Sequence, residues 1–490
     1  MLDILTSLSI YTLLWAAIGM ALGIFLGALP GFGGSSALAI VLPIAITMSP
    51  LNSMVFMINV YGGTHYGGGI TSVMLGVPGD AAGAATVFDG FPMTRKGKGS
   101  EALAMGAMGS FVGGFLSVLA FLFFAPALAQ FGLRFGPPEF FVLVVFGLTV
   151  LASVDAERIW KGLFAGGIGM AIGAIGVDRY WGEPRAVFDV AHIEEGIPFV
   201  PALLGLFCMS QMLELINEKK LEQEGTSPAN PTFRGIFKGM ALAFRHWRVM
   251  LQSSLIGTFI GALPGAGATI AAFIAYMFAK NTSKHPEKFG TGVPEGVIAP
   301  EAGNSSNVGG ALIPTFALGI PGSGAAAVLM GVMMFMGLRP GPQLFMEQID
   351  LIRTLGVYLL FGCLMIGVCG AIAAKYFYRV TQVPMPILVP CTVVAVSVGA
   401  YAYRTEVFDI GVMLVMGAFG YLLTRFRYPL SGVVLGLVLG PMAEVYFVES
   451  VEMAAWDFSI FFTRPICIVL WICMFAVVFG SGFITRMTGR

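Results

Sequence analysis

Residues 27–33 read GALPGFG, and residues 261–267 read GALPGAG, nearly the same segment 234 positions further along the chain. A second pair follows, since residues 75–80 read LGVPGD and residues 318–323 read LGIPGS, 243 positions apart. Self-similarity at a nearly fixed separation is typical of internal duplication. The sequence therefore predicts two related halves within one chain of 490 residues.

Composition indicates where both halves reside. Hydrophobic residues make up 57% of the chain and charged residues 11%, whereas soluble domains have roughly 45–50% and about 25%. Uncharged apolar segments at 8–29, 102–133, 355–374 and 465–485 are each long enough to cross a hydrocarbon core of about 30 Å. We expect an all-α polytopic membrane protein with about 12–15 crossings.

Charge distribution orients these crossings. Lysine and arginine concentrate at 94–99, 217–248, 280–288 and 425–427, whereas 178–195 is acidic or mixed. By the positive-inside rule the basic set is cytoplasmic, the N-terminus is periplasmic and the C-terminus is cytoplasmic. The two GALPG helices then run in opposite directions, so the halves form inverted-topology repeats. The balance of 27 basic and 27 acidic residues leaves no basic surface for nucleic acid.

The predicted domain organisation follows from the repeat. We assign residues 1–216 to the first half, 217–240 to a cytoplasmic linker and 241–490 to the second half. Each half contains one glycine-rich segment, 51–92 or 292–338, in which we expect broken helices or re-entrant hairpins. Inverted repeats with broken helices are typical of secondary transporters, with the site at the midplane, and we expect a scaffold plus moving transport regions of the elevator type.

The predicted site lies where the two glycine-rich segments correspond. The second offset aligns YGGT at 61–64 with NSSN at 304–307, and we expect the helix to break at both places. Non-helical backbone at membrane depth persists only inside protein or beside water. Half-helix ends attract carboxylates and cations, while short oxygen side chains suit a desolvated alkali ion.

Twelve residues form the predicted site. The substrate-binding candidates are Thr64, His65, Tyr66, Ser305 and Ser306. The candidate sodium ligands are Gly63, Gly76, Asp80, Asn304, Asn307, Gly319 and Ser323.

Structural alternatives accompany these assignments. Small polar residues also mediate helix packing, Asp80 is equally suited to capping a helix, and His65 is as well suited to packing as to binding. The turns Pro30–Gly31 and Pro264–Gly265 would start helices cleanly and rank below the two expected breaks.

Other functional classes are poorly supported. The chain has no GxxxxGK[ST] segment for a nucleotide, and no catalytic set completes a protease-like motif. We therefore expect a protein that is not an enzyme. A passive anion channel needs a continuous polar pathway, and polar stripes are few outside the two glycine-rich segments.

The motifs resemble those of one family of bacterial transporters. The matching segments are GALPGFG at 27–33, YGGTHYGGGITSVMLGVPGDAAGAATVFDGFPM at 61–93, GALPGAGATIAAF at 261–273 and PEGVIAPEAGNSSNVGGALIPTFALGIPGSGAAAVLMG at 294–331. Together they resemble the large membrane subunit of the tripartite tricarboxylate transporters.

That resemblance implies an inner-membrane symporter driven by sodium or protons. It implies two partners, a small membrane subunit of about four helices and a periplasmic solute-binding protein that delivers an organic carboxylate, citrate-like or otherwise. No cofactor is implied. We expect sodium coupling because the predicted ligands are neutral oxygens, whereas proton coupling would depend on Asp80 or His65. The stretch GNSSN at 303–307 departs from the alanine-containing sequence frequent in the family, which leaves the carboxylate open.

Overall fold

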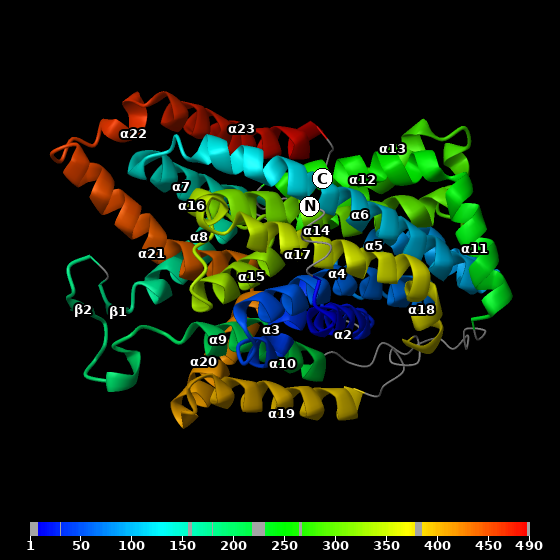
Figure 1. The fold of residues 1–490 in the computed structure, drawn as a ribbon, viewed down its shortest axis with the longest axis horizontal. Helices are drawn as coiled ribbons and strands as arrows, with labels where there is room; N and C mark the ends of the chain where they lie inside the picture. Colours follow the sequence, from blue (N-terminus) through cyan, green and yellow to red (C-terminus); the bar gives the residue numbers. More distant parts are fainter. Residues whose placement is uncertain are drawn as a thin grey trace.

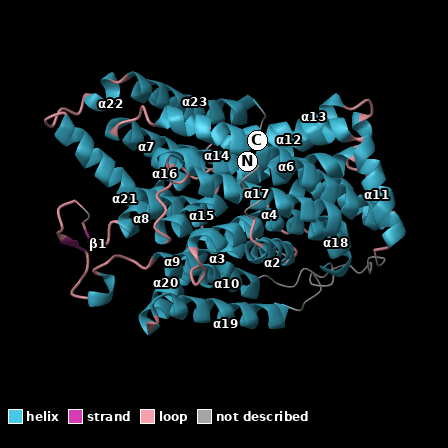
Figure 2. Ribbon diagram, in the orientation of Figure 1, coloured by secondary structure: helices cyan, strands magenta, loops and turns pink. Residues whose placement is uncertain are grey.

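The computed structural model confirms an all-α polytopic membrane protein. It describes residues 8–29, 31–154, 159–178, 180–217, 231–263, 267–377 and 385–487. Most of the long helices run side by side along the longest axis (Figure 1). The strands of the described residues are β1 (Gly176–Val177) and β2 (Pro184–Arg185), which pair antiparallel (Figure 2).

The helices fall into two groups, before and after the segment 218–230 in the sequence. Before it come α2 (Ile10–Gly27), α3 (Gly34–Ala45), α4 (Pro50–Leu75), α5 (Ala84–Arg95), α6 (Gly99–Gly132), α7 (Pro137–Val154), α8 (Ile159–Gly173), η1 (Ala191–Ile193), α9 (Phe199–Leu203), η2 (Leu204–Met209) and α10 (Ser210–Asn217). After it come α11 (Phe233–Arg245), α12 (Trp247–Ala262), α13 (Gly267–Thr282), η3 (Pro286–Lys288), α14 (Glu295–Leu318), α15 (Gly324–Phe335), α16 (Pro342–Glu347), α17 (Ile349–Met365), η4 (Ile366–Gly370), α18 (Ala371–Phe377), α19 (Met385–Arg404), α20 (Val407–Arg425), α21 (Leu430–Met453), α22 (Ile460–Thr463) and α23 (Pro465–Met487).

Membrane-spanning capacity is spread along the chain. Seven helical segments in the described residues are long and apolar enough to cross a bilayer, among them α2, α6, α20 and α21. Several shorter apolar helices, such as α3 and α15, accompany them. Short helices beside full spans are typical of transporters whose chain turns inside the membrane.

Helices α4 and α14 form the centre of the bundle. Every residue of α4 from Ser53 to Met74 and every residue of α14 from Gly296 to Ala317 is buried. α4 packs along α2, and α14 packs along α6, α12 and α13. Burial on all sides is what a helix without a polar face requires.

The expected breaks at 61–64 and 304–307 are wrong in position, because α4 and α14 are continuous helices through both stretches. Their small residues instead allow close helix packing, which keeps the backbone hydrogen bonds inside each helix. The chain leaves helical geometry later, at Gly76 and Gly319, whose φ angles of 70° and 71° are left-handed. These residues end α4 and α14, as glycine commonly does at a helix C-terminus.

Matching glycines bring the outer helices against these central ones. A Cβ at Gly23 of α2 would lie 2.3 Å from the Val60 carbonyl oxygen, and one at Gly257 of α12 would lie 2.2 Å from that of Gly303. Likewise Gly27 faces the Thr64 carbonyl and Gly261 faces the Asn307 carbonyl. These are positions that the sequence repeat equates, so both pairs of helices use the same close approach.

The two ends of the bundle differ in character. α11, which includes the end of the predicted linker 217–240, stands across one end, and the β1–β2 hairpin lies at the other (Figure 1). The described end of the linker, which lies within α11, and the β-hairpin segment are therefore at opposite ends of the bundle.

Candidate functional site

A cavity of about 200 Å³ lies where segments of both halves meet. Its lining combines small residues with a few polar side chains. The polar ones are Ser35, Tyr61, His65, Asp80, Thr269, Asn307 and Ser323.

Four helices begin at this cavity. α3 begins after Gly33, α13 begins at Gly267, α15 begins after Ser323, and the turn containing Asp80 leads into α5. Free backbone N–H groups and the helix dipole make a helix N-terminus favourable for an anion. The arrangement therefore suits a ligand with more than one carboxylate.

The lining repeats itself between the two halves. Ser35 corresponds to Thr269 by the first sequence offset, and Asp80 corresponds to Ser323 by the second. The pair at 80 and 323 differs in charge, since Asp80 is the one described lining residue that carries a formal charge. The cavity is thus built nearly symmetrically but is electrostatically polarised.

Hydrogen bonds stabilise the turn that contains Asp80 and the turn that contains Ser323. Asp80 Oδ1 accepts from the Gly83 amide at 2.8 Å, and Ser323 Oγ accepts from the Ala326 amide at 3.2 Å. Asp80 therefore stabilises the turn that leads into α5, whereas the N-cap position of α5 is Gly83. The Gly31 amide also donates to the Gly79 carbonyl at 3.0 Å, which ties the first GALPG turn to the α4–α5 turn.

Two buried side chains at the cavity have unused hydrogen-bonding groups. Neither ring nitrogen of His65 and neither amide atom of Asn307 has a partner among the described residues. The His65 ring instead packs edge-on against Tyr61, with ring centroids 5.0 Å apart. Because unsatisfied buried polar groups are uncommon and costly, both side chains are suited to binding a ligand.

Residues 13–435 match the tripartite tricarboxylate transporter TctA family. The chain belongs to this family. A relative from Agrobacterium vitis, the uncharacterized 52.8 kDa protein in the TAR-I ttuC′ 3′ region, is 32% identical over 461 residues, which cover 94% of this chain and 91% of the relative. Another protein of that organism, in the TAR-II ttuC′ 3′ region, is 31% identical over 210 residues, which cover 43% of this chain and 87% of the relative. No solved structure matches.

Membership in the TctA family identifies the chain as a subunit of a tripartite transport system rather than an enzyme. The predicted family and the predicted class of membrane protein are thereby confirmed. A multi-span chain of this family is consistent with a bacterial inner membrane.

The structure of this TctA-family chain brings four of the twelve predicted site residues to the cavity. They are His65, Asp80, Asn307 and Ser323. Tyr61, Ser35 and Thr269 also line it but were not predicted. The repeat itself carried the missing signal, because Ser35 and Thr269 follow the two GALPG turns at equivalent positions.

Packing accounts for several of the remaining predicted residues. Thr64 Oγ1 donates to the Tyr61 carbonyl at 2.8 Å, and Ser306 Oγ donates to the Gly303 carbonyl at 3.1 Å. A Cβ at Gly63 would lie 2.5 Å from the Met20 carbonyl oxygen. These three predicted residues do not line the cavity, because each helix face that contains them packs against a neighbouring helix.

The other predicted residues also lie away from the cavity. Gly76 and Gly319 are turn residues, and the packing of Tyr66 brings its ring close to Gly370. Ser305 faces a separate small cavity beside Gly62. The alternation of faces along a continuous helix explains this scatter, since neighbouring residues point in different directions.

One predicted residue joins the two halves. Asn304 Nδ2 donates to the His65 carbonyl at 3.2 Å, so α4 and α14 meet at their midpoints. The predicted convergence of the two segments is therefore present, although His65 and Asn307 rather than Thr64 and Ser305 face the cavity.

The GALPG turns, which rank below the expected breaks in the sequence analysis, are followed by residues that lie at the cavity. Gly33 and Gly267, directly after the turns, line the cavity. Pro30, Pro264 and Gly265 lie outside the described residues. Helices α3 and α13, which follow these turns in the sequence, begin at the cavity wall.

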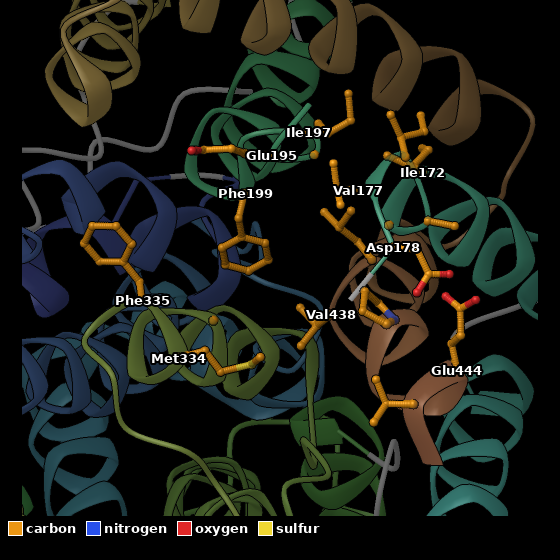
Figure 3. A pocket seen from close by; sticks show the side chains of 18 of the residues that line it. Ile172, Val177, Asp178, Glu195, Ile197, Phe199, Met334, Phe335, Val438 and Glu444 are labelled. Atoms are coloured by element: carbon orange, nitrogen blue, oxygen red, sulfur yellow. The ribbon is translucent and has the colours of Figure 1, made fainter. Parts of the chain in front are cut away.

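A larger cavity of about 560 Å³ lies beside the β-hairpin (Figure 3). Its apolar wall includes Phe199 and Met334. Arg185 forms salt bridges there with Asp178 and Glu444. Its charged lining residues are Asp178, Arg185, Glu195, Arg339 and Glu444. Acidic side chains outnumber basic ones, so this cavity is less favourable for a multivalent anion than the one at the four helix N-termini.

Proposed function

We propose that this chain is the large transmembrane subunit of a binding-protein-dependent symporter that imports an organic di- or tricarboxylate with sodium ions. The proposal places the carboxylate and the cation together in the 200 Å³ cavity. It retains the two predicted partners, a small membrane subunit and a periplasmic solute-binding protein.

The four helix N-termini are the observation that carries the carboxylate assignment. Their N–H groups favour an anion without adding a buried charge. The hydroxyls of Ser35 and Thr269 and the amide of Asn307 add donors between these ends. The cavity is smaller than a typical drug-binding site of about 300–1,000 Å³, which suits a small organic acid.

The carboxylate of Asp80 supports cation coupling. An anionic substrate in the same small cavity would be repelled by this charge, strongly so at low dielectric. A sodium ion held between them by Asp80 and the neutral oxygens of Asn307 and Ser323 would convert that repulsion into attraction. Substrate and sodium would then bind cooperatively, which is the physical requirement for coupled transport.

Proton coupling through Asp80 or His65 is the competing mechanism. It predicts that a pH gradient drives uptake in the complete absence of sodium. A passive anion channel predicts flux that never exceeds equilibration with the external concentration.

Reconstitution of the complete tripartite complex in proteoliposomes tests the proposal. Uptake of radiolabelled citrate, succinate and tartrate is measured with an imposed sodium gradient, an imposed pH gradient, or neither. Accumulation above the external concentration under the sodium gradient is the expected result. Accumulation under the pH gradient in sodium-free medium would establish the proton mechanism, and linear uncoupled flux would establish a channel.

A further inference from the structure

One buried carboxylate lies outside the cavity and has no place in the proposed mechanism. Glu301 of α14 is 1% exposed. Its Oε1 accepts a hydrogen bond from Thr86 Oγ1 at 2.7 Å, and its Oε2 accepts one from Ser110 Oγ at 3.1 Å. Within the described residues no lysine, arginine or histidine forms a salt bridge with it. A charged carboxylate in such surroundings is costly unless neutralised.

Two glycines allow neighbouring helices to approach Glu301 closely. A Cβ at Gly69 of α4 would lie 2.4 Å from Glu301 Oε1, and one at Gly109 of α6 would lie 3.4 Å from its Cβ. Two glycine-containing helix faces thus enclose the side chain from either side. The hydroxyls of Thr86 and Ser110 can either donate to a carboxylate or accept from a carboxylic acid, so they serve both protonation states.

The surroundings connect Glu301 to the substrate cavity. Asp80 lines the cavity, and its Oδ1 atom lies 3.1 Å from where a Cβ at Gly68 would be. Gly68 is adjacent to Gly69, against which Glu301 packs. The two carboxyl groups therefore lie against neighbouring residues of α4, and each is within electrostatic range of the other.

We propose that Glu301, held by Thr86 and Ser110, is a proton-binding site that couples proton movement to carboxylate transport. The inference rests on the proposed function and adds a proton to the transported sodium and organic acid. On one side of the membrane a proton leaves cavity water and forms an O–H bond at a Glu301 carboxylate oxygen. After the site opens to the other side, that O–H bond breaks and the proton returns to water there.

The titratable neighbours of Glu301 are few. Tyr66 faces it from α4, with a hydroxyl that has no partner among the described residues. Asp80 faces it from the α4–α5 turn. Further along α5, Asp89 accepts from the Gly292 amide at 2.7 Å and also from the Tyr276 hydroxyl of α13 at 3.0 Å.

Two further carboxylates on these helices have partners of their own. Glu101 of α6 pairs with Lys238 of α11. At the start of α14, Glu295 lies 3.3 Å from His246, which precedes α12. The loss or gain of a proton at Glu301 would therefore be felt chiefly by Tyr66 and Asp80.

Glu301→Gln in the reconstituted tripartite complex is the decisive variant. It keeps the size and hydrogen-bonding capacity of the side chain but cannot bind or release a proton. Substrate-driven acidification is followed with a pH dye inside the vesicles, and carboxylate counterflow is measured in parallel. We expect loss of acidification with counterflow within about twofold of wild type, because exchange does not require net proton movement. Acidification at the wild-type rate would overturn the inference.

Glu295→Gln is the matched control. Glu295 is the first residue of the same helix, and its carboxylate lies 3.3 Å from His246. It should leave acidification and counterflow unchanged. Wild-type complex that transports no carboxylate would refute the proposed function. Wild-type complex that transports with sodium but without acidification would refute only the proton site.

Thr86→Val tests the same site if the Glu301 variant does not fold. Removing this donor weakens stabilisation of the ionised carboxylate, so the proton binds more tightly. The pH at which uptake is half-maximal should rise by about one unit. An unchanged pH profile would overturn the inference.

Discussion

The side chain of Asn307 offers a sharp test of the cavity, because its two amide atoms have no partner among the described residues. Asn307→Ala removes a group that contacts the proposed substrate but no hydrogen bond described within the protein. A hydrogen bond to a charged group contributes about 1.5–3 kcal/mol. At about 1.4 kcal/mol per factor of ten, the substrate KM should rise roughly 10- to 100-fold.

Asn304→Ala is the matched comparison, one helical turn away. Asn304 donates to the His65 carbonyl and does not line the cavity. Hydrogen bonds between membrane helices are worth about 0.6 kcal/mol on average, so this variant should unfold at a lower temperature while the substrate KM changes much less than in Asn307→Ala.

Uptake kinetics in proteoliposomes and thermal unfolding in detergent measure the two effects. We expect Asn307→Ala to lose substrate affinity but keep its stability, and Asn304→Ala to lose stability but keep its substrate affinity. A wild-type KM in Asn307→Ala would show that the carboxylate binds elsewhere. Equal destabilisation of both variants would show that Asn307 serves packing.

Three further predictions follow from the packing, the charge and the choice of cavity. Alanine at Gly63 or Gly257 should lower the unfolding temperature in detergent, because each Cβ would meet a backbone oxygen at 2.5 Å or closer. Alanine at Gly167, where a Cβ would have no atom within 4 Å, should leave the unfolding temperature unchanged. Equal effects at the three positions would refute the packing argument. Asp80→Asn keeps an oxygen for the hydrogen bond from the Gly83 amide and for a cation, so sodium-dependent uptake should persist at a higher half-saturating sodium concentration. Complete loss of both uptake and its pH dependence would instead favour protons. Arg185→Gln breaks the salt bridges of the larger cavity but should leave the substrate KM unchanged. A rise in KM of more than about tenfold, or 1.4 kcal/mol, would indicate that the substrate binds in the larger cavity.

The family and the membrane character were predictable from local sequence. Apolar segments such as 102–133, which lies within α6, have the length of a crossing regardless of their neighbours. The segment LGVPGD also marked a genuine end of a helix, since Gly76 adopts a left-handed conformation that favours glycine.

The position of the chain break and the identity of the cavity residues were not predictable in this way. The stretch YGGTHYGGG has weak helix propensity in isolation, yet it is helical because α2 packs against Gly63 and Gly67. Propensity is a local quantity, and close packing against a neighbouring helix overrides it.

The sequence by itself showed two similar GALPG segments, two glycine-rich segments and a chain with only 11% charged residues. These features predict two related apolar halves. Only the tertiary structure decided which faces of α4 and α14 point into the cavity and which pack. The physical reason is that residues on a continuous helix turn through about 100° per position, so Thr64 and His65, adjacent in sequence, face different neighbours. The surroundings of Glu301 were settled in the same way, since Thr86 and Ser110 reach it from helices that are remote in the chain.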